Sequence, residues 1–191
     1  ANGIAGVQSN TVLLRWPRTE EFPLAVARSM RRFDALDKSL LVVSMDSEPQ
    51  ERLRTIDVWW SGKEDNGDLM LLLAHLLSRS DGWRRSTLTL KTIVQTEAEI
   101  LERRRALKAI CEGTRIGARV EVVLQLEGQS VQQTIHAHSK SATLVFLGLG
   151  FPEEGEEEAF GKRLKELVEP LSRVVLVRNS GPFRGRLIEL D

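Results

Sequence analysis

The feature that most constrains the fold is an apolar run at residues 142–149, which reads Ala-Thr-Leu-Val-Phe-Leu-Gly-Leu. The run is too short to span a bilayer, and it is apolar on both faces, as a central parallel strand is. Segments with strand and helix patterns alternate on either side of it. Such alternation predicts a parallel sheet with helices on both faces. We therefore expect an α/β fold with a doubly wound, mainly parallel sheet.

Hydrophobic periodicity places the remaining elements. The expected strands are 11–16, 39–45, 55–60, 86–94, 119–126, 142–149 and 173–177, with a final edge segment at 183–190. The expected helices are 22–36, 68–77, 97–114, 130–138 and 156–171, and the third of them ends at Gly113 or Gly117. Residues 55–178 supply a complete doubly wound unit. The first two strands and their helix either extend the same sheet or form the tail of a preceding domain, and the polar stretch 46–53 is the best linker.

Composition and charge exclude several classes of protein. The 41% hydrophobic and 28% charged residues are typical of globular proteins and exclude a disordered chain. Lys+Arg and Asp+Glu both number 27, so the basic excess of a nucleic-acid-binding domain is missing. The basic runs 84–85 and 103–105 are interpreted as solvated surface, with a contact to anionic lipid headgroups as the alternative. We predict no nucleic-acid partner.

Cysteine usage and hydropathy indicate a compartment. The single Cys111 excludes an internal disulfide and a cysteine-rich zinc site, and it suits a reducing environment. No apolar run reaches the ~18–20 residues of a transmembrane helix, and the first ten residues lack a signal-peptide pattern. We expect a soluble, cytosolic chain. Because it begins with Ala1, we expect it to be a piece of a longer protein.

Glycine motifs for binding phosphate are missing from the sequence. Neither GxxxxGK[ST] nor GxGxxG occurs. The nearest approach is Gly148-Leu149-Gly150, at the strand edge where doubly wound sheets bind ligands. Five glutamates within residues 153–158 would repel a phosphate there. An ordinary turn before an acidic helix start is the preferred interpretation, with an anion site as the alternative.

The residues capable of catalysis or metal binding form no convincing group. His136 and His138 are two apart, which points them to different sides of a helix, so a solvated helix end is expected. His75 is expected to be a packed or interface histidine. Cys111 is interpreted as a small buried hydrophobe rather than a nucleophile. We predict no catalytic residue, no metal ligand and no enzymatic activity.

The helix expected at 68–77 is apolar on nearly every side, and Asp68 suits its positive N-terminal end. Its sequence is Asp-Leu-Met-Leu-Leu-Leu-Ala-His-Leu-Leu. Leu69, Leu72, Leu73 and Leu76 form one face. Met70, Leu71 and Leu77 then lie on the outer side and are the candidates for an interface with another chain or domain. The alternative is a helix buried between two layers of the same domain.

The order of these motifs resembles the cytosolic C-terminal domain of cation-chloride cotransporters. The most specific part is Thr-Ile-Asp-Val-Trp-Trp at 55–60, followed by an apolar helix ending His-Leu-Leu-Ser-Arg-Ser-Asp-Gly-Trp and the strand 86–94. Further similar segments are Gly3–Pro17, Arg103–Leu107, Ser139–Leu147 and Arg173–Asn179. The segments between Met45 and Thr55 and between Leu126 and Ser139 are short, so the chain looks like a compact prokaryotic member.

The resemblance implies a domain of two universal-stress-protein-like units. Residues 1–45 would end the first unit, 46–53 would be the linker, and 54–191 would form the second unit. The membrane domain, in the same polypeptide, would precede Ala1 and carry the ions, so no direct ion binding is expected in this part. The implied function is a non-enzymatic regulatory and dimerisation domain on the cytoplasmic side of the membrane, a homodimer without a cofactor. Universal-stress folds sometimes bind ATP, so the alternative is a stand-alone nucleotide-binding protein of that type.

Overall fold

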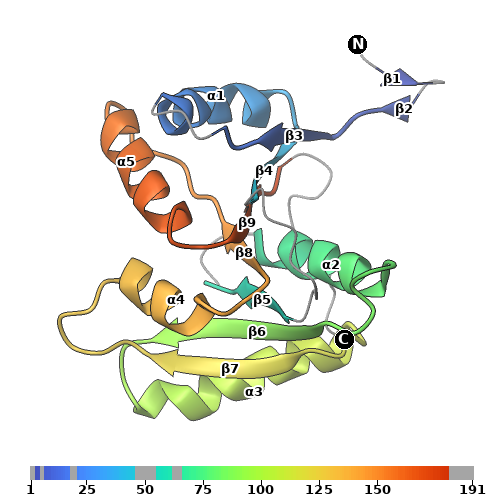
Figure 1. Ribbon diagram of the computed structural model, residues 1–191, viewed down its shortest axis with the longest axis vertical. Helices are drawn as coiled ribbons and strands as arrows, with labels where there is room; N and C mark the ends of the chain where they lie inside the picture. Colours follow the sequence, from blue (N-terminus) through green and yellow to red (C-terminus); the bar gives the residue numbers. More distant parts are fainter. Residues whose placement is uncertain (1–2, 5–6, 18–20, 46–54, 62–65, 181–191) are drawn as a thin grey trace.

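The computed structural model describes residues 3–4, 7–17, 21–45, 55–61 and 66–180 (Figure 1). Seven strands form one sheet in the order β3-β4-β9-β8-β5-β6-β7, and β1 pairs with β2 in a separate two-stranded sheet. The strands are β1 (Gly3–Ile4), β2 (Val7–Gln8), β3 (Thr11–Arg15), β4 (Ser39–Met45), β5 (Thr55–Trp59), β6 (Thr87–Val94), β7 (Arg119–Leu124), β8 (Leu144–Gly148) and β9 (Arg173–Arg178). The helices are α1 (Phe22–Ala35), α2 (Asn66–Arg79), α3 (Ala98–Gly113), α4 (Val131–Ser139) and α5 (Glu157–Val168).

The strand directions divide the sheet into two parallel groups. Strands β9, β8, β5, β6 and β7 are parallel to one another, and β3 is parallel to β4, but β4 pairs antiparallel with β9. The junction is reinforced by side chains, because Ser39 Oγ donates to the Ser180 carbonyl at 2.9 Å and accepts from the Ser180 amide at 3.0 Å. The first two strands therefore extend the same sheet. Their origin in a separate unit stays a prediction.

Helices cover both faces of the sheet (Figure 1). One core cluster joins α1, α4 and α5 to one face, and a second joins α2 and α3 to the other. Strand β8 contributes to both clusters through alternate side chains, since Val145 and Leu147 face the first while Leu144 and Phe146 face the second. The prediction of a doubly wound, mainly parallel α/β sheet is confirmed. No helix among the described residues combines the length and apolarity needed to cross a bilayer.

The element boundaries agree closely with those expected, apart from a few ends. The helix expected from residue 68 begins at Asn66, so Asp68 lies in its first turn. Helix α3 ends at Gly113, but the residue with a left-handed backbone just after it is Arg115, with φ of 55°, rather than a glycine. Pairing by β7 stops at Leu124 instead of Leu126. The edge segment expected at 183–190 lies outside the described residues.

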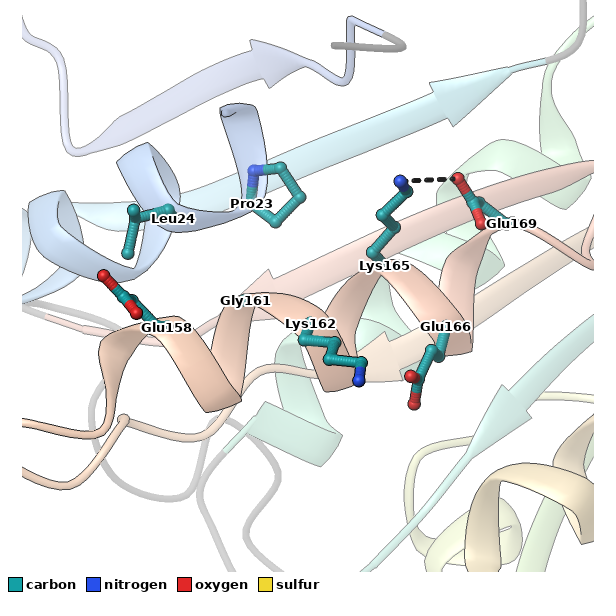
Figure 2. A pocket seen from close by; sticks show the side chains of 8 residues that line it. All are labelled: Pro23, Leu24, Glu158, Gly161, Lys162, Lys165, Glu166 and Glu169. Atoms are coloured by element: carbon teal, nitrogen blue, oxygen red, sulfur yellow. Dashed lines mark ion pairs between the residues drawn. The ribbon is translucent and has the colours of Figure 1, made fainter. Parts of the chain in front are cut away.

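Helices α1 and α5 approach closely at Gly161 (Figure 2). A Cβ atom at Gly161 would lie 3.2 Å from the Leu24 amide nitrogen and 3.3 Å from the Pro23 carbonyl carbon. Beside this contact the two helices leave a groove of about 460 Å³, with Lys and Glu side chains along the α5 wall. One pair of them, Lys165 and Glu169, is 3.7 Å apart. The glycine is thus needed for the packing of α1 on α5.

Substituting Gly161→Leu is expected to lower the free energy of unfolding by about 1–3 kcal/mol, because its side chain would push against the α1 backbone. The gain in helix propensity, about 1 kcal/mol, offsets only part of that cost. Urea unfolding followed by circular dichroism measures the change. Gly117→Ala is the matched control, since a Cβ atom there meets nothing within 4 Å. Equal stability of the two variants would show that the helices can separate without cost.

Candidate functional site

The edge of the sheet at the carboxyl end of β5 and β8 is where the topology places a ligand crevice. The chain runs outward from β5 through β6 to β7 and then returns to β8, on the other side of β5. Doubly wound sheets bind ligands where the strand order reverses in this way. The segment Gly148-Leu149-Gly150 lies at this edge, as expected from the sequence.

Side chains of the protein itself fill this crevice. Asn66, at the start of α2, is 4% exposed; its Nδ2 donates to the Leu149 carbonyl at 3.2 Å, and its Oδ1 accepts from the Asn179 amide at 2.7 Å. A Cβ atom at Gly148 would lie 3.3 Å from Asn66 Nδ2, and one at Gly67 would lie 2.8 Å from the Trp60 ring. These glycines therefore make room for Asn66 and Trp60. The absence of a side chain at Gly148 is explained by packing rather than by a bound phosphate.

Removing the Asn66 amide is expected to lower the free energy of unfolding by about 2–3 kcal/mol, because Asn66→Ala leaves a buried amide and a buried carbonyl without these partners. Gln132→Ala is the control, since Gln132 makes an exposed bond to the Arg163 carbonyl. The two variants are compared by urea unfolding. A loss below about 0.5 kcal/mol for Asn66→Ala would mean that water replaces both bonds at this edge.

The segment after Gly150 is fixed by two arginines. Arg31 of α1 donates to the Pro152 carbonyl at 2.8 Å, and the guanidinium of Arg178 lies 3.9 Å from the centre of the Phe151 ring. The first turn of α5 carries Glu157 and Glu158, and the side chain of its N-cap residue, Glu156, makes no capping hydrogen bond. Two acidic groups at this helix start oppose the binding of an anion. The preferred interpretation, an ordinary turn, stays a prediction.

A partly buried polar cluster lies on the α4 side of β5, at the end of α4. We call it the Lys91 cluster, and its members are Asp57, Trp59, Lys91, Glu121, His138 and Ser139. Lys91 Nζ lies 3.0 Å from Asp57 Oδ2 and 3.2 Å from Glu121 Oε2, and it donates to the His138 carbonyl at 2.6 Å. Lys91 and Asp57 are 6% and 5% exposed. Their charges are therefore removed from water and compensated by each other.

One further side chain, Ser139, donates a hydrogen bond to Asp57 and is itself held by Trp59. Ser139 Oγ donates to Asp57 Oδ2 at 2.7 Å and accepts from Trp59 Nε1 at 3.0 Å. The Lys91 ammonium also lies 5.8 Å from the centre of the Trp59 ring. The cluster thus links β5, β6, β7 and the end of α4. Removing either partner of the Asp57–Lys91 pair would leave an uncompensated buried charge, which is costly.

The sequence interpretation did not single out Asp57 or Lys91. Both occupy strands that were correctly predicted, and each is the one charged residue within its apolar strand core. A carboxylate and an ammonium in two neighbouring buried strands need a partner, because a lone buried charge is costly. The presence of one carboxylate and one ammonium in two buried strands was the feature of the sequence from which the ion pair could have been predicted. The pairing itself depends on β5 lying next to β6 with Asp57 and Lys91 on the same face.

The histidines lie in separate places, as their spacing predicted. His136 Nε2 is 2.9 Å from the Leu167 carbonyl, at the α5 side, whereas His138 Nδ1 is 3.2 Å from Glu121 Oε1, at the β7 side. His75 is half-buried on α2, where the Ser78 hydroxyl donates to its carbonyl at 2.7 Å. Across the described residues, no three histidine, cysteine or acidic side chains gather in a metal-binding arrangement.

Cys111 is buried on the inner side of α3, as expected. Burial raises the pKa of its thiol, and the charge of Glu112 raises it further. The reactive thiolate is therefore disfavoured at neutral pH. This environment suits the interpretation of Cys111 as a packing residue.

The expected orientation of α2 is wrong. Met70 and Leu71, predicted to face outward, are 2% and 0% exposed and belong to the chain's own core, and Leu77 is half-buried against it. Leu76, on the other face, is 58% exposed. Because leucines occupy nearly every position, the sequence offered no polar face to fix the rotation of the helix. A role for α2 in an interface stays a prediction, but Met70 and Leu71 cannot supply it without unfolding.

Comparison with known proteins assigns the family. The model of solute carrier family 12 matches residues 25–147, which is more than half of the chain. The chain belongs to this family of cation-chloride cotransporters. Membership confirms the family identified from the sequence. The matched region includes β5, β6, β7 and α4, and therefore every residue of the Lys91 cluster.

Two solved structures share the fold of this family member. The crystal structure of the cytoplasmic domain of a prokaryotic cation chloride cotransporter superposes with a TM-score of 0.62 at 19% identity, over 93% of this chain and 67% of that one. A universal stress protein from Archaeoglobus fulgidus DSM 4304 superposes with a TM-score of 0.59 at 12% identity, over 90% of this chain and 61% of that one. The universal-stress-protein-like fold class is thereby confirmed.

The residues that carried the resemblance meet in space. Asp57 and Trp59 come from the Thr-Ile-Asp-Val-Trp-Trp strand, Lys91 from the strand 86–94, and Ser139 from the start of the segment 139–147. All four belong to the Lys91 cluster. The most specific motif of this cotransporter domain is therefore a packing and ion-pair motif.

Proposed function

We propose that the chain is a non-enzymatic, cytoplasmic regulatory and dimerisation domain of a cation-chloride cotransporter, tethered to a membrane domain in the same polypeptide. The observation that carries the proposal is the family match together with the use of its motif residues in the Lys91 cluster. Those residues join strands and a helix, and among the described residues the histidines and Cys111 contact backbone, carboxylate or core groups. Cytoplasmic placement is supported by the related cytoplasmic domain.

A domain of this kind influences transport only through contacts that differ between transporter states. If its dimer or its docking on the membrane domain is tighter in one state, it shifts the population toward that state by the difference in free energy. No ion needs to bind in this part of the polypeptide. The mechanism requires a rigid body, and the Lys91 cluster provides rigidity by fixing four elements together.

The test compares the complete cotransporter with a form truncated before this domain, both reconstituted in liposomes. We expect chloride-dependent cation uptake to change in rate while its dependence on both ions is kept. Equal rates would contradict a regulatory role. Loss of ion coupling would contradict the placement of ion binding outside this part. Sedimentation of the 191-residue chain tests self-association separately.

The second candidate is a nucleotide-binding protein of the universal-stress type, favoured by the fold similarity alone. Asn66 and Trp60 occupy the crevice that a nucleotide would need, which opposes it. Calorimetric titration of the chain with Mg-ATP decides between them. Micromolar binding of ATP that is lost in a folded Gly148→Val variant would favour the nucleotide-binding hypothesis. No heat at millimolar ATP would support the proposed function.

A further inference from the structure

We propose that β7 is the dimerisation edge: two copies pair antiparallel through this strand, with Val120 opposite Val120 at the two-fold axis. This inference deepens the proposed self-association and rests on it. Strand β7 ends the sheet in the described part of the chain and pairs only with β6. An unpaired edge presents a row of amides and carbonyls that another strand can bind.

The hydrogen bonds identify which residues face the free edge. The Gln125 amide donates to the Val94 carbonyl of β6 at 2.9 Å. Successive residues of a strand direct their backbone groups to opposite edges, so Val123, Glu121 and Arg119 also face β6. The amides and carbonyls of Val120, Val122 and Leu124 therefore face outward. In an antiparallel dimer, these even-numbered residues must form the hydrogen-bonded pairs.

Charge favours this register over the two next to it. Pairing Val120 with itself places Arg119 opposite Glu121, twice by symmetry. It also places Val122 beside Ala118, whose amide already donates to the Ile116 carbonyl at 2.9 Å, so the hydrogen-bonded pair of the dimer forms at Val120. The Arg119–Glu121 pairs are then non-hydrogen-bonded pairs, whose side chains lie closest. A shift by one register step in either direction sets Glu121 against Glu121 or Arg119 against Arg119, and like charges directly opposite are destabilising. Glu121 already contacts Lys91 and His138, but its side chain is 40% exposed and Arg119 is exposed, so a second cation can reach it.

The surface beside the edge fits the same register. A groove of about 620 Å³ runs between the end of α3 and β7, with Cys111, Ile116 and Ala118 among its lining residues. The even-numbered side chains of β7 lie on this α3 side, since Val120 packs against the α2–α3 core cluster. In the proposed pairing, Val122 and Leu124 of the second copy approach this groove at Ala118 and Ile116. Apolar side chains then replace water in the groove.

The opposite edge of the sheet lacks this complementarity. Strand β3 reads Thr-Val-Leu-Leu-Arg, and Arg15 is its one charged residue. No antiparallel register of β3 with itself brings opposite charges together within the strand. Strand β7 is thus the edge of the sheet whose self-pairing can bring opposite charges together.

Disulfide trapping tests the register in the full 191-residue chain, with Cys111→Ala as background. Residues opposite each other in a hydrogen-bonded pair have Cα atoms about 5.5 Å apart, within the range of a disulfide. Val120→Cys is expected to form a covalent dimer under mild oxidation. Val122→Cys is the matched control, because its two copies would be about 13 Å apart along the strands. Equal crosslinking of both variants, or of neither, would overturn the proposal.

Sedimentation separates this inference from the proposed function. The unsubstituted chain is expected to sediment as a dimer, and Arg119→Glu is expected to raise its dissociation constant about tenfold by opposing two pairs of like charges. Arg104→Glu, the same charge change on the exposed side of α3, should leave the constant unchanged. A dimer that resists Arg119→Glu and does not crosslink at residue 120 overturns the β7 edge but keeps self-association. A monomer at every concentration overturns both.

Discussion

Replacing Lys91 with methionine is expected to lower the free energy of unfolding by about 3–5 kcal/mol, which is what removing one partner of a buried ion pair costs. Asp57 would remain 5% exposed without its cation. The ordinary stability of a domain is about 5–15 kcal/mol, so the variant is expected to be marginal at room temperature. Chemical unfolding followed by tryptophan fluorescence measures the change, since Trp59 is a member of the cluster.

Two further variants identify the cause of that loss. Lys140→Met removes an exposed ammonium next to the cluster and should change stability by less than about 0.5 kcal/mol. The double variant Asp57→Asn, Lys91→Met removes both charges and should recover part of the loss, because no buried charge stays unpaired. If Lys91→Met behaved like Lys140→Met, the cluster would not be what holds the four elements together.

Placing a carboxylate at residue 71 is expected to prevent folding of the chain. Leu71 is 0% exposed within the α2–α3 core cluster, so Leu71→Glu buries a charge with no partner and is expected to cost more than about 4 kcal/mol. Leu76→Glu, one turn away and 58% exposed, should fold with a melting temperature close to that of the unsubstituted chain. Circular dichroism on heating compares the two.

The comparison of Leu71→Glu with Leu76→Glu also decides how the effects of α2 variants on dimerisation are interpreted. A loss of dimer in Leu71→Glu would follow from unfolding and would say nothing about contacts between copies. A folded Leu71→Glu chain with an unchanged melting temperature would contradict the placement of α2 described above. A folded Leu76→Glu chain with reduced mass would instead bring α2 into the interface and weaken the case for β7.

Local pattern alone was enough for most of the architecture and for the family. Alternating or continuously apolar runs gave β4 and α3 to within a residue, because the period of the side chains follows from backbone geometry. The Thr-Ile-Asp-Val-Trp-Trp strand pointed to the cotransporter family before its residues had any position in space. The prediction of which side faces the core failed for α2. Leucines lie on nearly every side of that helix, so the sequence pattern does not distinguish an apolar face from a polar one.

The sequence by itself determined the elements, their α/β class, the family and the absence of a phosphate-binding motif. The tertiary structure decided the antiparallel pairing of β4 with β9, the rotation of α2, the filling of the crevice by Asn66, and the meeting of Asp57 with Lys91. The reason is the range of the interactions. Helix and strand periods are set by neighbours a few residues apart. These four features depend instead on contacts between residues 34 to 138 positions apart, or on the surface against which a helix packs.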